Sequence, residues 1–251
     1  MTQNDLKYYS SLLKKKFRFQ ENKFLAEGKK IVEEGINSKY WCEKIFISQK
    51  IYENLKGRRL FKNIDYEVLN RSELMRLTDT VAPQGVLGVF RIREIKKIED
   101  INSNIIVFLE NISDPGNLGT IIRICDWFGI NTILCSDNTV DAYNPKVIRS
   151  SMGSIFHLDI IDDFKTDSLD IFLRKGYKLV STDLNGINLY DFKIADKIII
   201  SFSNETTGPT ESLLNKSDYK ITIPKIGKAE SLNVAAASAV ILSELTKPFV
   251  K

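Results

Sequence analysis

The chain has 251 residues, 43% hydrophobic and 27% charged, with a formal net charge of +4 and a pI near 8.8. This composition is typical of a globular protein with a substantial core, in one large domain or two smaller ones, and the mild positive charge suits a polyanionic partner. No run of eighteen apolar residues and no signal-like N-terminal stretch occurs, so we expect a cytoplasmic protein with no membrane partner.

The cysteines and the histidine exclude several kinds of site. Cys42, Cys125 and Cys135 lie far apart and form no CxxC pair, so neither a disulfide framework nor a zinc site is predicted, and we expect small buried residues. The single histidine, His157, lies in IFHLDI, which we interpret as a strand. Catalytic triads and histidine-ligated metals usually need an imidazole in a polar loop, so no metal is expected.

Residues 1–95 are predicted to form a small α/β domain. A basic first helix is followed by FLAEGKKIVEEGIN, which we interpret as a second helix that stops near Gly35. KIFIS and YEVL predict short strands, and a turn at residues 83–85 leads into another strand. The charged stretch REIKKIEDINSN follows, and a boundary there gives domains of residues 1–95 and 96–251.

The second domain alternates apolar strands with helices, from IIVFLE and TIIRICDWFG to KITIP and NVAAASAVILSEL. This alternation predicts an α/β fold with a mostly parallel sheet covered on both faces. Ligands of such sheets bind at the carboxyl ends of the strands. Three of these ends carry unusual loops, and the functional search concentrates on them.

Each loop admits a structural and a functional interpretation. DPGNLGTIIR, residues 114–123, could be a simple strand-to-helix turn, or its glycines and Asn117 could approach a ligand. In SNETTGPTE, residues 203–211, Glu205 could receive hydrogen bonds from a ligand, or it could be an acid at a helix N-terminus with Thr210 as the cap. The SLN step before the alanine-rich helix could be plain capping or part of a site.

Together the three loops resemble the ordered motifs of the SpoU/TrmH RNA 2′-O-ribose methyltransferases, within the SPOUT superfamily. The motifs are N-x-x-D-P-x-N-x-G-x-x-x-R at residues 111–123, N-E-x-x-G at 204–208 and I-P-x-x-G-x-x-E-S-L-N-V at 223–234. The resemblance covers essentially all of residues 104–248. FLAEGKKIVEE and LTDTVAPQGVLGVF also resemble the ribosomal-protein-like substrate-binding domain of one branch of that family.

The resemblance implies a sheet that ends in a C-terminal trefoil knot, a homodimer, and S-adenosylmethionine (SAM) bound among the second and third loops. The implied cofactor-binding positions are Thr182, Ser203, Asn204, Gly208, Ile223 and Leu232. The implied catalytic and substrate-contacting positions are Asn117, Arg123, Glu205, Ser231 and Asn233. Two positions depart from the pattern: the family usually has glycine where this chain has Ser203, and an apolar residue where it has Lys225. A serine at 203 would be strained if that position needs a positive φ.

The implied chemistry limits what Arg123 can do. Methyl transfer to a ribose hydroxyl requires the oxygen in line with the S–CH₃ bond and the loss of the hydroxyl proton. The pKa of a guanidinium is above about 12, so it keeps its proton at neutral pH and is a poor base. We expect Arg123 to stabilise the developing alkoxide or the adjacent phosphate, while a phosphate oxygen, Glu205 or water takes the proton.

RNA recognition is expected from basic residues outside the three motifs. The candidate phosphate contacts are Lys14, Lys15, Lys16, Arg18, Lys29, Lys30 and Arg149. The N-terminal domain resembles those of rRNA-modifying members, so we favour rRNA over tRNA, and no DNA partner is expected. The alternatives are a tRNA 2′-O-methyltransferase, and a non-catalytic RNA-binding or ribosome-assembly protein that keeps the fold. The absence of a GxGxxG sequence disfavours a common Rossmann enzyme.

Overall fold

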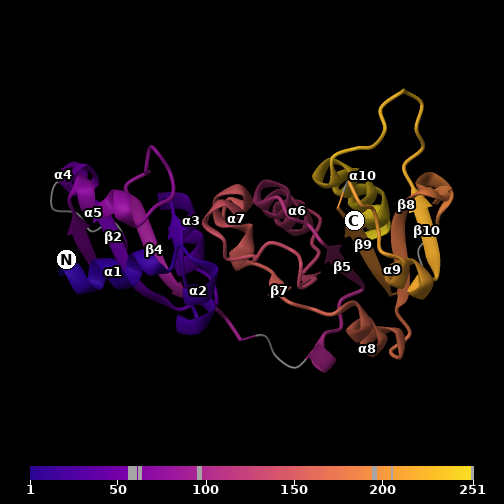
Figure 1. Ribbon diagram of the computed structural model, residues 1–251, viewed down its shortest axis with the longest axis horizontal. Coiled ribbons are helices and arrows are strands. Elements are labelled where there is room, and N and C mark those ends of the chain that lie inside the picture. Colours follow the sequence, from indigo (N-terminus) through magenta and orange to yellow (C-terminus); the bar gives the residue numbers. More distant parts are fainter. Residues whose placement is uncertain (56–60, 62–63, 95–97, 194–196, 205, 250–251) are drawn as a thin grey trace. The chain divides into compact units, whose positions relative to one another are not determined.

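The computed structural model describes residues 1–55, 61, 64–94, 98–193, 197–204 and 206–249 (Figure 1). Contacts within the chain define two compact units. Unit 1 comprises Met1–Glu94 and Asp141–His157, and unit 2 comprises Ile95–Val140 and Leu158–Lys251. The segment 141–157, which lies between two strands of unit 2 in the sequence, therefore packs with unit 1. The division into a substrate-binding domain of residues 1–95 and a methyltransferase domain of residues 96–251 stays a prediction.

Unit 1 contains a mixed sheet of four strands in the order β1-β4-β2-β3. Its strands are β1 (Lys23–Glu27), β2 (Cys42–Ser48), β3 (Tyr66–Leu69) and β4 (Val86–Arg91). Its helices are α1 (Gln3–Ser11), α2 (Lys15–Glu21), α3 (Lys29–Ile36), α4 (Gln49–Leu55), α5 (Arg71–Arg76) and α7 (Pro145–Ser151), with the 3₁₀ turn η2 (Ser154–Phe156). The β2–β3 pair is parallel, and β4 is antiparallel to both β1 and β2.

Both faces of this sheet are covered by apolar side chains. On one face, leucines of α1 and α5 pack against strand residues such as Leu25 and Phe46. On the other face lies an aromatic cluster: Phe24 is 4.8 Å from Tyr143 between ring centroids, and Phe90 is 4.9 Å from Phe156. Because Tyr143 and Phe156 belong to segment 141–157, this segment completes the core of unit 1.

Three predictions for these residues are wrong. The FLAE part of the second predicted helix is strand β1, which pairs with β4 from Lys23 to Glu27, and only α3 is helical. The basic first helix is two helices, α1 and α2. His157 does not lie in a strand but ends η2, where its Nε2 lies 3.3 Å from Glu34.

Unit 2 contains a sheet of six strands in the order β10-β8-β9-β5-β6-β7, in which every pair of neighbours is parallel. Its strands are β5 (Ile105–Glu110), β6 (Thr132–Cys135), β7 (Asp159–Ile161), β8 (Lys178–Asn188), β9 (Ile198–Ser203) and β10 (Tyr219–Thr222). Its α-helices are α6 (Pro115–Trp127), α8 (Asp170–Leu173), α9 (Glu211–Lys216) and α10 (Val234–Thr246). Its 3₁₀ turns are η1 (Ile98–Asp100), η3 (Thr166–Leu169), η4 (Leu189–Asp191) and η5 (Lys247–Phe249). The predicted parallel α/β sheet is confirmed.

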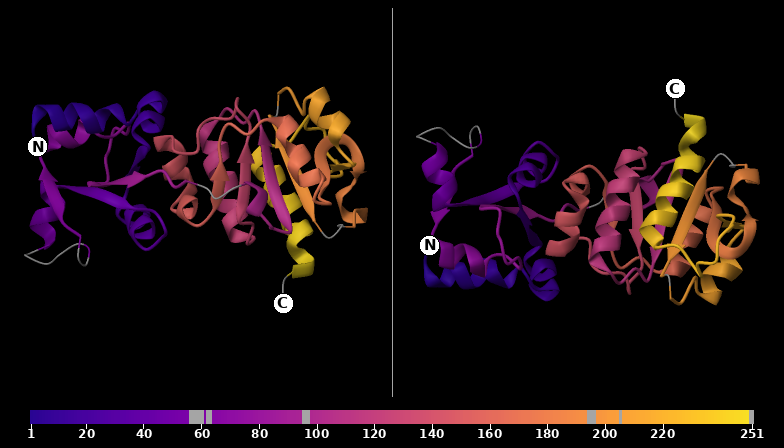
Figure 2. Two further views of the ribbon diagram at one scale, coloured as in Figure 1. Left: turned by 90° about the horizontal axis from the view of Figure 1, so that it is seen from below. Right: turned by 90° about the horizontal axis from the view of Figure 1, so that it is seen from above.

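Helices cover both faces of this sheet. Ile106 and Phe108 of β5 pack with Phe172 of α8 and Leu213 of α9 in one apolar cluster. Successive side chains of a strand point to opposite faces, so Val107 and Leu109, which are fully buried, face the other side. There α10 lies alongside α6, as Figure 2 shows for the yellow helix. Within the described residues, no helix combines the length and the apolar character needed to span a bilayer.

Candidate active site

The first motif forms the start of α6 rather than an extended loop. Asp114 caps the helix, because its carboxylate accepts a hydrogen bond from the Asn117 backbone N–H at 2.8 Å, and Pro115 occupies the first turn. The helix therefore begins earlier than TIIRICDWFG suggests, and Gly116 and Gly119 lie inside it. The turn before it needs one positive φ, 58° at Asn111.

The first and third motifs meet through two asparagines. The Asn233 side chain donates a hydrogen bond from Nδ2 to Oδ1 of Asn117 at 3.0 Å. Its own Oδ1 accepts from the backbone N–H groups of Ala235 and Ala236, which makes Asn233 the N-cap of α10. The capping interpretation is thus correct, and the same side chain also joins two predicted site residues.

The two roles of Asn233, as the N-cap of α10 and as a partner of Asn117, can be separated by substitution. In Asn233→Ala, loss of the cap is expected to cost about 0.5–2 kcal/mol of stability, and the contact with Asn117 disappears too. Asn233→Ser keeps a capping hydroxyl but is too short to reach Asn117, so we expect it to retain stability yet lose most methyl transfer. Thermal unfolding and a methyl-transfer assay on both variants test this. Equal activity of Asn233→Ser and the unmodified chain would remove Asn233 from the site.

Arg123 stands apart from this pair. It lies about two turns into α6, is exposed, and within the described residues makes no hydrogen bond or ion pair. Six residues separate it from Asn117, so the two side chains leave the helix about 120° apart. Trp127, one turn further along the same face, is 84% exposed. This chain alone therefore does not bring Arg123 together with Asn117 and Asn233.

The second motif follows β9, and its first residue is tied to a carboxylate of the neighbouring strand. Ser203 pairs with Glu110 in the β5–β9 register, and its hydroxyl donates to Glu110 Oε2 at 3.0 Å. Ser203 ends a regular strand and is not among the residues with positive φ. The serine is therefore accommodated in this fold without the backbone strain considered for it.

Hydrogen bonds connect the described residues of the second motif, Asn204 and Gly208, to each other and to the loop after β5. The Gly208 backbone N–H donates to the Asn204 carbonyl at 2.9 Å, and the Asn204 side chain donates to the Asn111 carbonyl at 3.3 Å. Gly208 has a φ of 67°, and a side chain there would meet no atom within 4 Å, so glycine is needed for its backbone conformation. Thr210 caps α9, as expected. Glu205 lies outside the described residues.

The third motif is an exposed segment between β10 and α10 that extends from the sheet (Figure 1). Ile223 is half-buried, Ser231 is exposed and Leu232 is 50% exposed. Lys225 is also exposed, and Ile226 is fully so. In the described part of the chain, the backbone groups of residues 225–232 have no hydrogen-bond partner. They are therefore available to a ligand.

Thr182 lies inside β8, directly after the point where the pairing of β8 with β9 ends. The β8–β9 pairing stops at Ser181, and the β8–β10 register shifts from Ser181 to Ile187, so Thr182 starts an irregular stretch of β8. Because β10, β8, β9 and β5 are parallel neighbours, their carboxyl ends lie at one edge of the sheet. That edge gathers Thr182, Ser203 and Ile223, which is the usual ligand position in open α/β sheets.

One candidate RNA contact is corrected. Arg18 is 1% exposed, and its guanidinium donates to both carboxylate oxygens of Asp141, the shortest distance being 2.8 Å. It also donates to the Leu12 carbonyl at 2.9 Å. A buried arginine with these partners cannot reach an RNA phosphate without breaking the core of unit 1. Arg149 is 22% exposed in its side chain and forms a two-point ion pair with Asp79, so it too is engaged.

The lysine candidates are placed differently. Lys14, Lys15 and Lys16 are all exposed at the start of α2, and Lys29 and Lys30 are exposed at the start of α3. Lys29 has a weak partner, Glu33, at 3.8 Å. These lysines remain candidates for contact with phosphate groups.

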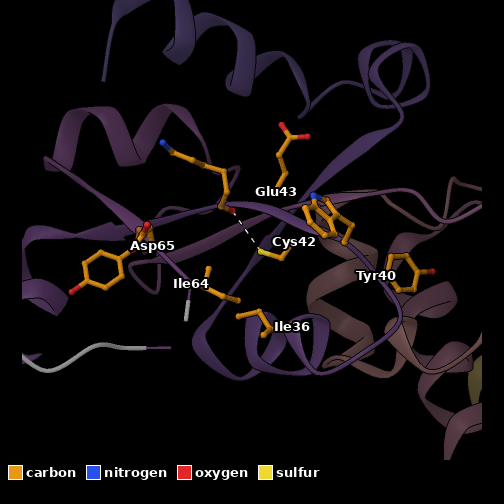
Figure 3. A pocket seen from close by; sticks show the side chains of 9 residues that line it. Ile36, Tyr40, Cys42, Glu43, Ile64 and Asp65 are labelled. Atoms are coloured by element: carbon orange, nitrogen blue, oxygen red, sulfur yellow. Dashed lines mark hydrogen bonds between the residues drawn. The ribbon is translucent and has the colours of Figure 1, made fainter. Parts of the chain in front are cut away.

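A cavity in unit 1 contains none of the motif residues (Figure 3). It has a volume of about 510 Å³ and is lined by Trp41, Cys42, Glu43 and Asp65, among others. Burial raises the pKa of the Cys42 thiol to about 11, so the thiol is protonated near neutral pH. With two carboxylates and an unreactive thiol, the cavity offers no evident chemistry. Cys125 and Cys135 are buried, as predicted, and burial raises the pKa of both.

Sequence reasoning missed Glu110. It is the last residue of the apolar strand IIVFLE, and its counterpart in β9 is Ser203, two residues before Glu205. The signal that selected Glu205, a carboxylate near the carboxyl end of an apolar strand, could have found Glu110 as well. Among the described residues, no group of three histidine, cysteine, aspartate or glutamate side chains is placed to hold a metal.

Known proteins resemble this chain over its whole length. The SpoU rRNA Methylase family model matches residues 104–243, and the MRM3-like substrate binding domain model matches residues 3–88. The 23S rRNA (guanosine(2553)-2′-O)-methyltransferase RlmP of Bacillus subtilis is 31% identical over 241 residues, which cover 96% of this chain and 95% of that protein.

Solved structures agree. A TrmH-family protein from Porphyromonas gingivalis has a TM-score of 0.86 and 27% identity, with 99% of both chains covered. An AdoMet-bound rRNA methyltransferase from Sinorhizobium meliloti has a TM-score of 0.86 and 26% identity, covering 100% of this chain and 97% of that one. The three motifs, the parallel sheet that aligns them and the matched family model lead to one conclusion: the chain belongs to the SpoU rRNA methylase family.

Proposed function

We propose that the protein transfers the methyl group of SAM to a ribose 2′-hydroxyl of ribosomal RNA. The observation that carries this proposal is the gathering of the three motif loops at one edge of a parallel sheet, with Asn117 and Asn233 in direct contact. The whole-length similarity to a protein named as a 23S rRNA 2′-O-methyltransferase supports rRNA over tRNA. An rRNA substrate also fits the cytoplasmic location expected from the sequence.

The residues present fit SAM. Backbone groups of residues 225–232, which have no hydrogen-bond partner among the described residues, and the polar groups of Asn204 and residues 206–208 offer donors and acceptors for an adenine edge and an amino-acid moiety. We assign Ser203, Asn204, Gly208, Ile223 and Leu232 to the cofactor, with Thr182 of the neighbouring strand β8. Bound SAM supplies an electrophilic methyl group on a sulfonium.

Side chains of the three motifs would then orient the ribose 2′-hydroxyl that accepts the methyl group. The new bond joins the ribose oxygen to the methyl carbon as the S–C bond breaks, and the hydroxyl proton must leave to a phosphate oxygen, to Glu205 or to water. We assign Arg123 to the developing alkoxide or the adjacent phosphate, because it is a permanent cation. Asn117, Ser231 and Asn233 would position the sugar, and this demand for alignment explains why two of them brace each other.

We further propose a homodimer and a trefoil knot. The exposed face of α6 that carries Arg123 and Trp127 would be part of the subunit contact, which would bring Arg123 to the subunit boundary. The topology supports the knot: β10 lies at the edge of the sheet beside β8, whereas α10 packs on α6, which follows a strand three positions away. The segment 223–233 must therefore cross the carboxyl ends of β8 and β9.

Unit 1 would bind RNA through its exposed lysines. Replacing Lys14, Lys15 and Lys16 together by alanine removes up to three phosphate contacts, so we expect weaker RNA binding and a smaller salt dependence. The slope of log Kd against log salt should fall by about 2–3. Lys50→Ala, at an exposed lysine of α4 outside the candidate set, is the control. An unchanged slope in the triple variant would assign RNA binding elsewhere.

The function is tested by transfer of labelled methyl from SAM to rRNA and to tRNA. We expect label in rRNA and one new alkali-resistant position, since a 2′-O-methyl group blocks hydrolysis there. Label confined to tRNA would support the tRNA alternative. SAM binding without transfer to either RNA would support the non-catalytic alternative.

A further inference from the structure

Glu110 is a buried carboxylate that the proposed chemistry does not use. It lies at the end of β5 and is 2% exposed. Within the described residues it has no lysine or arginine partner. Burying a charged carboxylate costs several kcal/mol unless hydrogen bonds replace those it made with water. The donors that bind Glu110 therefore indicate its role.

All three of its partners are neutral donors from the ends of one loop. Oε2 accepts from the Ser203 hydroxyl at 3.0 Å and from the Thr210 backbone N–H at 3.0 Å. Oε1 accepts from the Thr210 hydroxyl at 2.6 Å. Ser203 ends β9, and Thr210 caps α9 by accepting from the Leu213 N–H at 3.2 Å. One carboxylate therefore binds both ends of the segment 203–210.

We propose that Glu110 is a positioning residue that fixes the 203–210 loop in the conformation that binds SAM. We also propose that Ser203 replaces the glycine usual in the family because its hydroxyl is one of the three donors. Both statements rest on the proposed function, since they assign the loop to the cofactor. Glu110 itself would not touch the reacting atoms.

The physical reason is preorganisation. Six residues connect Ser203 to Thr210, and Gly208, with a φ of 67°, adds local freedom to the backbone. A loop whose ends are held in place has lost conformational entropy before the ligand arrives, so the ligand binds more tightly. Release of the ends is expected to weaken SAM binding more than it slows transfer from saturated enzyme.

Glu110→Gln is the central variant, because it keeps the shape of the side chain but replaces one acceptor by a donor. We expect the Kd for SAM, measured by calorimetry without RNA, to rise about tenfold, as expected for one hydrogen bond of about 1.4 kcal/mol. The KM for SAM should rise similarly, while kcat at saturating SAM should change less than threefold. Ser203→Ala, which removes one donor, should raise Kd by about threefold.

Glu27→Gln is a control with similar neutral donors, although Glu27 also has a distant cation, Arg149, at 3.9 Å. Glu27 is a carboxylate of unit 1, 5% exposed, that also accepts from two threonine hydroxyls, of Thr78 and Thr80, and from one backbone N–H, of Gln84. We expect it to lower stability about as much as Glu110→Gln, with SAM affinity unchanged. Faster hydrogen exchange in residues 204–210 should accompany Glu110→Gln alone.

The outcomes are distinguishable. If the unmodified chain binds no SAM, the proposed function fails. If it binds SAM and a folded Glu110→Gln binds equally well, the positioning role is rejected while the function stands. If Glu110→Gln does not fold, Ser203→Ala decides, because an unchanged Kd and unchanged exchange in that variant would also reject the role.

Discussion

Arg123→Ala is expected to reduce methyl transfer by a factor of about 10²–10³ or more, as loss of a preorganised charge at a developing oxyanion usually does. Stability should stay nearly unchanged, because Arg123 is exposed and has no partner among the described residues. SAM affinity should also stay unchanged, since Arg123 lies on α6 and not on the two loops assigned to the cofactor. Single-turnover transfer and SAM calorimetry on the same preparation measure both quantities.

Arg123→Lys separates a charge role from a base role. A lysine keeps the positive charge but lacks the bidentate fork, so we expect partial activity with the same dependence on pH as the unmodified chain. Arg174→Ala, at another exposed arginine of unit 2, is the matched control and should retain full activity. Loss of SAM binding in Arg123→Ala would reject the assigned role, and a new activity inflection near the lysine pKa in Arg123→Lys would indicate proton transfer at this position.

The fold of unit 2 could be predicted well because its signals are local. Runs such as IIVFLE and KIIISFS are short and mostly apolar, as strands buried on both faces are, and all six residues of each strand are buried. Glycines, prolines and polar residues follow each strand and mark where it ends. Because the strands are parallel, these ends lie at one edge of the sheet. The three motifs follow strands of this sheet, so their order and spacing predicted a candidate site at that edge.

The wrong predictions concern residues whose partners are distant in the sequence. FLAE can form a helix, but Phe24, Leu25 and Ala26 are buried by pairing with β4, more than sixty residues away, and the tertiary contact overrides the local preference. Arg18 reads as one more cation of a basic face because its partner, Asp141, is 123 residues away. Charge patterns alone do not distinguish a free cation from a paired one.

The candidate site shows the same limit. Loop positions were predictable, but the side-chain links between them were not: the contact of Asn117 with Asn233 spans 116 residues, and that of Glu110 with Ser203 spans 93. Such links require the register of neighbouring strands and the packing of α10 on α6, which no local pattern encodes.

Asp141→Ala is expected to destabilise unit 1 by about 3–5 kcal/mol, because it leaves the Arg18 guanidinium buried without its counter-charge. The side chains of Arg18 and Asp141 are 2% and 3% exposed, so water cannot replace the lost partner. Urea denaturation gives the overall loss, and hydrogen exchange resolves where it falls. We expect the amides of β1 and β4 to lose protection more than those of β5 and β9.

Removing both charges at once should cost far less than removing one. In Arg18→Met with Asp141→Leu, apolar side chains of similar size replace the pair, and such replacements are often neutral or stabilising. A double-mutant cycle would then give a coupling of several kcal/mol that reflects mainly the penalty of the orphaned charge. Because Asp141 begins the segment 141–157, this pair also anchors that segment to α2. If Asp141→Ala cost less than about 1 kcal/mol, Arg18 must reach solvent or another anion readily, and its exclusion from the RNA-binding set would have to be reversed.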